Sequence, residues 1–383
     1  MKLQRNGRSK ALAIGAVALV SSLSLAACGS DNNNSSAGST GGTGGSSTSA
    51  AAIKCADKQA PMLAAGSTAQ GTAIDVWKAA FGAACPSSTL NYSGGGSGAG
   101  VQQFNQGKVT FAGSDAALKA TEVEASKAVC TGGGQGIDLP MVGGLVSIIF
   151  NVQGVDHLVL DAPTLAKIFD SQITKWNAPE IAALNPGVTL PAADIQAFHR
   201  SDDSGTTQNL TAYLAKASNG AWAYPAAKTW AGKGGQSAAQ SAGVSAQVKS
   251  VPNSIGYAEL SYAQQNNLKS ASIATGASKP VDATAVNAAT TIATAKSAGA
   301  SNPNDLALSL DYATKAEGAY PIVLVTYEIV CDKGNKPETL DTLKAFLNYT
   351  ISDAGQHAIG DKGYVPLPKE VSDKVKTVIG TLS

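Results

Sequence analysis

Short apolar runs alternate with amphipathic segments through most of this chain, and the alternation constrains its fold more than any other feature. Residues 60–67, "APMLAAGS", predict a strand that ends in Gly-Ser. Residues 72–84 place Ile74, Trp77 and Phe81 at helical spacing. The same order recurs downstream. Strands that alternate with helices predict an α/β protein with a largely parallel sheet covered on both faces.

Two longer apolar runs stand apart from this pattern. They are "LPMVGGLVSIIFNV" at 139–152 and "YPIVLVTYEIVC" at 320–331, and each predicts a long buried strand. The chain beyond residue 52 has about 330 residues, which exceeds one comfortable hydrophobic core and predicts two lobes.

The start of the chain indicates export. A basic stretch is followed by an apolar run, residues 11–27, that ends in Leu-Ala-Ala before Cys28. This order is typical of a secretory signal, and the run is short for a membrane span. The cysteine after Ala-Ala resembles the lipobox of bacterial lipoproteins, so residues 1–27 would be removed and Cys28 would carry a lipid such as palmitate. Residues 29–52 are rich in Gly and Ser, and we expect residues 28–52 to form a flexible tether.

Four further cysteines agree with export, because an even number in an exported chain favours two disulfides. Metal binding is the rival, but the sequence has no C-x-x-C and only three histidines, none near a cysteine. We therefore expect no metal. We favour Cys55 with Cys85, because the strand and helix between them would bring both to one end. We favour Cys130 with Cys331, because they fall at the same end if the two long apolar strands pair antiparallel; the other two pairings remain open.

Glycine together with serine, threonine or aspartate follows four of the expected strands. In open α/β sheets ligands bind beyond the carboxyl ends of the strands, and helix N-termini there attract anions. One such end alone would be an ordinary helix cap, and "GGGSGAG" fits neither common nucleotide motif. The argument rests on the four ends together, which are Gly66-Ser67-Thr68, the loop holding Ser97, Gly113-Ser114-Asp115, and Ser204-Gly205-Thr206.

Arg200 is the only arginine outside the basic start of the chain, where Arg5 and Arg8 lie. A guanidinium grips a tetrahedral oxyanion through two N–H groups at once, which a lysine cannot do. Asp202 could orient this side chain and partly balance its charge. The alternative is a surface ion pair of little energetic value.

The motifs taken together resemble the phosphate-binding subunit of the Pst phosphate ABC transporters. The resemblance runs in order over nearly all of residues 60–370. It implies a two-lobed type II periplasmic-binding-protein fold with two hinge crossovers, near 142–145 and 318–322. It is carried by Gly66-Ser67-Thr68, "NYSGGGSGAGV", "FAGSDAAL", "ITKWNAPEIAALNPGVTLP", "HRSDDSGTT", "SIGYAELSYAQQNNL" and "YVPLPKEV".

The resemblance also implies a division of the chain and a set of phosphate contacts. Residues 53–142 plus 321–383 would form lobe I, and residues 143–320 would form lobe II. Ser67 and Asp202 would support the site. The implied phosphate-binding residues are Thr68, the amide of Ala69, Ser97, Asp115, Arg200, Ser204, Gly205 and Thr206.

Asp115 would separate phosphate from sulfate. A carboxylate only accepts hydrogen bonds, and phosphate at neutral pH carries a proton to donate, whereas sulfate carries none. An acceptor facing an unprotonated oxyanion would cost several kcal/mol. Two positions depart from the family pattern: Ala69 stands where many relatives have Phe, and Asp203 stands where Gly is common.

Three other readings stay open from sequence. Ser204 with His199 could suggest a hydrolase, although G-x-S-x-G is missing. A receptor for another oxyanion, such as sulfate or molybdate, is disfavoured by Asp115. A lipid-anchored surface protein with a sensory role fits equally well. We expect a monomer, no enzyme activity, no cofactor, a permease partner, and no nucleic acid, because the exported chain lacks a basic excess.

Overall fold

The computed structural model describes residues 53–299 and 301–383, which lie in one compact unit. The predicted signal, Cys28 and the tether fall outside the described residues. Within the described part, no helix has both the length and the apolar character needed to cross a membrane.

One end of the main sheet is built as the alternating pattern predicts. Three parallel strands lie side by side, and Met62 pairs with Leu90 while Ala64 pairs with Phe111. The predicted helical spacing buries Trp77 and its neighbours against this sheet. The elements are β1 (Met62–Gly66), α1 (Gly71–Ala84), β2 (Leu90–Ser93), α2 (Ser97–Asn105), β3 (Phe111–Ser114) and α3 (Ala120–Ser126).

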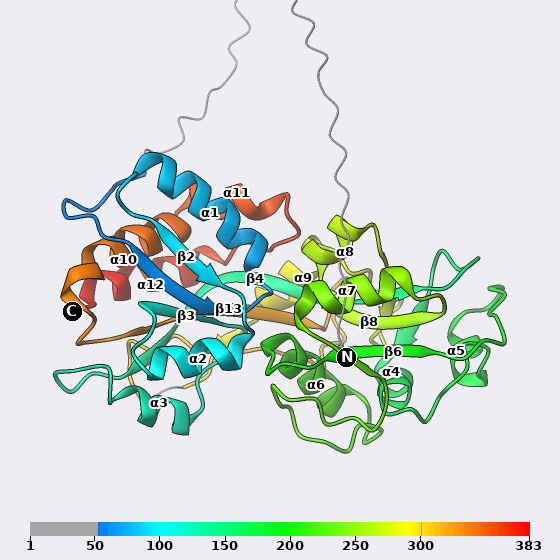
Figure 1. Ribbon diagram of the computed structural model, residues 1–383. Coiled ribbons are helices and arrows are strands. Elements are labelled where there is room, and N and C mark those ends of the chain that lie inside the picture. The colour runs from blue at the N-terminus through cyan, green and yellow to red at the C-terminus, as the bar shows by residue number, and fades with distance from the viewer. Residues whose placement is uncertain (1–52, 300) are drawn as a thin grey trace, which may run out of the picture. The chain divides into compact units, whose positions relative to one another are not determined.

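The two long apolar runs form the centre of the sheet. β4 (Gly136–Asn151) is one 16-residue strand, and its first part pairs antiparallel with β13 (Val323–Cys331). The rest of β4 pairs with β8 (Ser254–Glu259). β4 therefore runs from one half of the sheet into the other, and Figure 1 shows it spanning the middle of the ribbon.

The second half of the sheet continues from β8. Strand β6 runs parallel to β8 and to β7, and two short strands, β10 and β5, pair apart from the main sheet. The elements of this half are β5 (Val159–Asp161), α4 (Ala162–Phe169), α5 (Pro179–Leu184), β6 (Gln196–Arg200), α6 (Gly205–Ala217), β7 (Gln236–Ala238), α7 (Gln240–Ser250), α8 (Leu260–Asn266), β9 (Lys269–Ser270) and β10 (Ser272–Ala274).

The last part of the chain returns to the first half. Helices α10 and α11 lie near α1 (Figure 1), where Trp77 Nε1 donates to Gly355 O at 2.8 Å and the Phe81 and Phe346 rings meet edge to face. The remaining elements are α9 (Ala285–Ile292), β11 (Lys296–Ser297), β12 (Leu308–Ser309), α10 (Pro337–Thr350), α11 (Asp353–Gly360) and α12 (Lys369–Thr381).

The main sheet is mixed: the expected parallel strands form its two halves, and the two long strands at its centre pair antiparallel. The strand order is β2-β1-β3-β13-β4-β8-β6-β7, and β13 and β4 are antiparallel to their neighbours. The reason lies in the connections, because β4 leaves the first half and β13 re-enters it. Two strands that cross in opposite directions pair antiparallel, whereas each half keeps its parallel strands.

Both expected disulfides are present. Cys55 is bonded to Cys85 and Cys130 to Cys331, with Cα–Cα distances of 5.6 and 5.3 Å. The second bond joins the region where β4 begins to the residue where β13 ends, since Cys331 pairs with Gly136. The antiparallel register thus accounts for the pairing.

The Gly143-Gly144 pair lies within β4 rather than in a loop. A Cβ on Gly143 would lie 2.8 Å from the carbonyl oxygen of Val365, with which Gly143 forms a bridge. Close packing therefore explains Gly143 without any appeal to motion. The second crossover is tied to the same strand, because Tyr320 Oη donates to Val146 O at 2.9 Å.

Candidate anion-binding site

Strand and helix ends from both halves of the sheet meet at Ser97. Its hydroxyl donates to Asp115 Oδ2 at 3.2 Å and accepts from the backbone N–H of Asp115 at the same distance. It also accepts from the N–H of Gly205, the first residue of α6, at 3.2 Å. One oxygen therefore links three of the four predicted strand ends, although Gly205 is 108 residues away in the chain.

Asp115 is a buried carboxylate, with 3% of its surface exposed. Its Oδ1 accepts hydrogen bonds from Ser67 Oγ at 2.5 Å and from Thr326 Oγ1 at 2.7 Å. Burial raises the pKa of Asp115 to about 6, and the negative charge of Glu259 adds to the increase, while the hydroxyl donors and Arg200 limit it. Asp115 therefore changes charge close to neutral pH.

Arg200 ends strand β6 and is also buried, at 2% exposure. Asp202 takes two of its nitrogens, with Nε donating to Oδ1 at 2.8 Å and Nη2 to Oδ2 at 2.5 Å. The third nitrogen, Nη1, donates to Ser241 Oγ at 3.0 Å and to Thr206 Oγ1 at 3.4 Å. Asp202 thus orients the guanidinium as predicted, and the surface-pair reading does not fit a buried arginine.

The remaining predicted residues lie close by but have varied partners. Thr68 Oγ1 is 2.9 Å from Ser241 Oγ, and the N–H of Ala69 donates to Ser67 Oγ at 3.0 Å. The Ser204 hydroxyl caps α6 by accepting from the N–H of Thr207. A cap of this kind orients the helix whose N-terminus presents Gly205 to the site.

Three residues of the candidate site were not predicted from the sequence. Thr326 comes from the middle of β13 and Ser241 from the second residue of α7, and neither follows a predicted strand end. Glu259 ends strand β8 and is 3% exposed. Its position, an acid at a strand's carboxyl end within "YAEL", is the one sequence signal that could have found it.

Several contacts outside the central cluster also join the two halves. The N–H of Gly98 donates to Asp203 O at 3.0 Å, and Asn209 Nδ2 donates to Asp115 O at 2.7 Å. Lys228 forms an ion pair with Glu122 at 2.9 Å. The carboxylate of Asp203 is exposed and accepts from Thr229, so this departure from the family pattern adds a surface charge and one side-chain hydrogen bond.

His199 is not arranged as a catalytic base. Its ring stacks on Trp230 with centroids 4.8 Å apart, and Nδ1 lies 3.0 Å from Arg200 O. Burial lowers the pKa of His199. Among residues 53–299 and 301–383 no hydrogen bond joins His199 to Ser204, whose hydroxyl caps α6. The hydrolase reading therefore has no geometric support.

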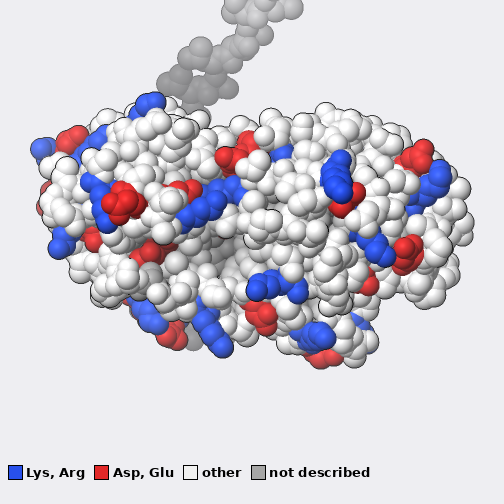
Figure 2. Space-filling view, turned by 90° about the horizontal axis from the view of Figure 1, so that it is seen from below, with Lys and Arg blue, Asp and Glu red and all other residues white. Residues whose placement is uncertain are grey.

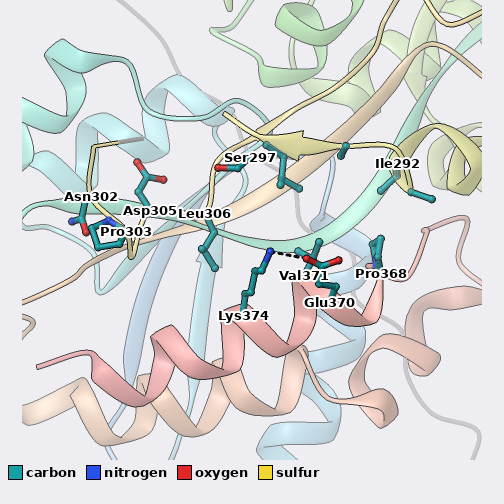
Figure 3. A pocket seen from close by; sticks show the side chains of 13 residues that line it. Ile292, Ser297, Asn302, Pro303, Asp305, Leu306, Pro368, Glu370, Val371 and Lys374 are labelled. Atoms are coloured by element: carbon teal, nitrogen blue, oxygen red, sulfur yellow. Dashed lines mark hydrogen bonds and ion pairs between the residues drawn. The ribbon is translucent and has the colours of Figure 1, made fainter. Parts of the chain in front are cut away.

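A separate cavity of about 260 Å³ lies beside α12 (Figure 3), lined by apolar side chains and by Asp305, Glu370 and Lys374. Lys374 is paired with Glu370 at 2.8 Å. None of the predicted anion-binding residues lines it. The described residues contain no group of three metal-ligating side chains. On the face shown in Figure 2, basic and acidic side chains are intermixed.

The mixed sheet is crossed by two long strands, and a buried arginine lies beside buried carboxylates between its halves. This is a type II periplasmic-binding-protein fold. Proteins of this class are two-lobed and bind small solutes. The model of the PBP superfamily domain matches residues 32–354.

Individual relatives narrow the family. The phosphate-binding protein PstS3 of Mycobacterium bovis is 42% identical over 386 residues, covering 100% of both chains. The phosphate-binding protein PstS of Xylella fastidiosa is 33% identical over 314 residues, covering 79% of this chain and 80% of its own. This chain belongs to the PstS-type phosphate-binding subunits, which are solute-binding proteins and not enzymes.

Solved structures agree on the fold. A phosphate-binding protein from Stenotrophomonas maltophilia has a TM-score of 0.63 at 21% identity, covering 83% of this chain and 93% of that one. A high-affinity periplasmic phosphate-binding protein with bound phosphate has a TM-score of 0.67 at 22% identity, covering 84% and 93%.

Proposed function

We propose that this chain binds inorganic phosphate outside the cytoplasm and delivers it to the permease of an ABC transporter. The observation that carries the proposal is a buried Arg200, oriented by Asp202, in the same site as a buried Asp115 that accepts from hydroxyl donors. The PstS-type relatives are named for phosphate binding, which supports the same ligand.

Each half of the site has a distinct part in this proposal. Lobe I, formed by residues 53–142 and 321–383, would contact phosphate through Thr68, Ala69, Ser97 and Asp115. The second lobe, residues 143–320, would contribute Arg200, Ser204, Gly205 and Thr206. Ser67 and Asp202 would hold Asp115 and Arg200 in place. Closure of the lobes about the two crossovers would bury the anion.

Recognition would combine attraction with rejection. The Arg200 guanidinium and the N-terminus of α6 attract any oxyanion. Asp115 accepts a hydrogen bond only from a ligand that carries a proton, so it penalises sulfate, which has none at neutral pH. A buried acceptor to which the wrong ligand cannot donate gives stronger specificity than one more attractive contact to the right ligand.

Calorimetric titration of residues 53–383 with phosphate and then sulfate tests the proposal. Bound ligand is first removed by partial unfolding and dialysis. We expect tight phosphate binding and no sulfate binding. Asp115→Asn keeps an oxygen for Ser67 and Thr326 but adds N–H donors, so it should bind sulfate at least about a hundredfold better than wild type does.

Asp203→Asn is the matched control, because it removes a carboxylate from the exposed surface near the same site. It should retain the wild-type preference. If a folded, ligand-free sample releases or absorbs no heat on titration with phosphate, phosphate binding is refuted. If wild type binds sulfate in preference, a receptor for another oxyanion is favoured. Co-purification with a permease tests delivery, and its failure would favour a sensory role.

The location at a membrane rests on the sequence. Lipid attachment at Cys28 remains a prediction, and mass spectrometry of the mature N-terminus tests it. A mature chain that begins elsewhere than Cys28, without added lipid mass, would overturn the anchor.

A further inference from the structure

Glu259 is a buried carboxylate that the phosphate proposal leaves without a role. It ends strand β8, which lies between β4 and β6 in the sheet, so it occupies a strand end next to that of Arg200. Its side chain is 3% exposed. A carboxylate in such a place needs partners, because an uncompensated buried charge is costly.

The hydrogen bonds of Glu259 are incomplete. Oε1 accepts from the Thr206 hydroxyl at 2.5 Å. Oε2 is buried and has no hydrogen-bond partner among residues 53–299 and 301–383. Because a hydroxyl has one proton, Thr206 can offer the ligand only its lone pairs while this bond is kept, and Arg200 Nη1 already donates to it at 3.4 Å. Glu259 thus turns a predicted donor into an acceptor.

The charges around Glu259 point the same way. The ionisable groups that interact with its charge are Asp115, Arg200, Tyr262 and Tyr364. The only cation among them, Arg200, is already paired with both oxygens of Asp202. The carboxylates of Asp202, Asp115 and Glu259 therefore share the positive charge of one guanidinium. A second negative charge on the ligand would be opposed, whereas each ligand proton would supply a donor.

We propose that Glu259 is a second hydrogen-bond acceptor for the protons of phosphate. Together with Asp115 it selects singly charged, doubly protonated phosphate over the doubly charged form. This inference rests on the proposed function. Asp115 alone requires one proton on the ligand, which both forms carry. A second acceptor distinguishes between them.

The wild-type protein provides the first test, by titration calorimetry with inorganic phosphate from about pH 5 to pH 8. Above the second pKa of phosphate, the apparent affinity should fall with increasing steepness, towards about tenfold per pH unit, because only the scarcer form binds. Titrations in two buffers of different ionisation enthalpy should show an uptake of about one proton per phosphate at pH 8. This readout needs no variant.

Glu259→Gln provides the second test. The glutamine keeps an oxygen to accept from Thr206 and presents an NH2 donor where Oε2 lies. It should flatten the decline with pH and bring proton uptake at pH 8 close to zero. Glu317→Gln is the charge-matched control, because Glu317 is exposed and accepts from Ser278 far from the site. It should reproduce the wild-type profile.

The outcomes separate the two proposals. No phosphate heat from wild type at any pH would refute phosphate binding itself. Tight wild-type binding without proton uptake at pH 8 would overturn the role of Glu259 and leave phosphate binding intact. A Glu259→Gln protein that binds more weakly at every pH with the wild-type slope and uptake would also overturn it, because Glu259 would then only position Thr206.

Discussion

Replacing Asp115 by asparagine should remove a loss of stability that the ligand-free wild type undergoes as the pH rises. Burial raises the folded-state pKa of Asp115 from 3.8 to about 6. Between these values the folded state holds a proton that the unfolded state has released. The folded protein therefore loses stability as the pH rises through this window.

The size of the effect follows from the shift. About two pKa units correspond to about 3 kcal/mol, absent below the unfolded-state pKa and complete above about pH 6. Asparagine does not titrate. At pH 4, just above the unfolded-state pKa, a small part of this effect is already present. The stability difference between Asp115→Asn and wild type should therefore be about 2 kcal/mol more favourable to the variant at pH 8 than at pH 4.

Urea unfolding of both phosphate-free proteins at the two pH values measures how the difference in their free energies of unfolding changes with pH. Other titrating groups cancel because both proteins contain them, and the difference near pH 4 reports the altered hydrogen bonds to Ser67 and Thr326. Phosphate must be absent, since a bound ligand stabilises the folded state by mass action. A stability difference between the two proteins that is equal at both pH values, or that shifts towards wild type as the pH rises, would refute the raised pKa of Asp115.

Three further changes test other parts of the structure. Arg200→Lys keeps the charge but loses the planar pair of donors, and calorimetry should show phosphate binding weaker by about 2–5 kcal/mol; an unchanged affinity would contradict the orienting role of the guanidinium. Gly205→Ala would place a Cβ 2.6 Å from the Cβ of Asp115; it should weaken binding at least about tenfold with little loss of thermal stability, and normal binding would show that the halves need not approach so closely. Replacing Cys130 and Cys331 by serine should lower the free energy of unfolding by about 2–5 kcal/mol in urea, and no change would mean that the bond constrains neither state.

The sequence was most informative where function requires an unusual residue type. Arg200 was found because it is the only arginine beyond the basic start of the chain, and Asp202 followed from the need to orient a guanidinium. Ser97, Asp115 and Gly205 were found because small polar residues follow parallel strands, and the structure brings all three to one hydroxyl. Local rules sufficed in these cases, because each strand end has a fixed relation to the helix after it.

The missed residues depend on which strands become neighbours. Thr326 reaches Asp115 only because β13 lies beside β3, a pairing across 211 residues of chain. Ser241 meets Thr68 from the opposite half, across 173 residues. Hydrophobic periodicity specifies a strand but not its partner, so long-range pairing lay beyond it.

The place of β13 in the sheet also determines when the protein can fold. Strand β3 does not touch β4 directly, because β13 lies between them. Residues 62–151 therefore cannot complete their half of the sheet until residue 331 has been synthesised, and the C-terminal helices that cover α1 follow later still. Contacts so distant in sequence close slowly, and exposed strand edges invite wrong pairing in the meantime. One edge of β3, near the start of the folded body, therefore stays without its partner strand until nearly the whole chain has been synthesised.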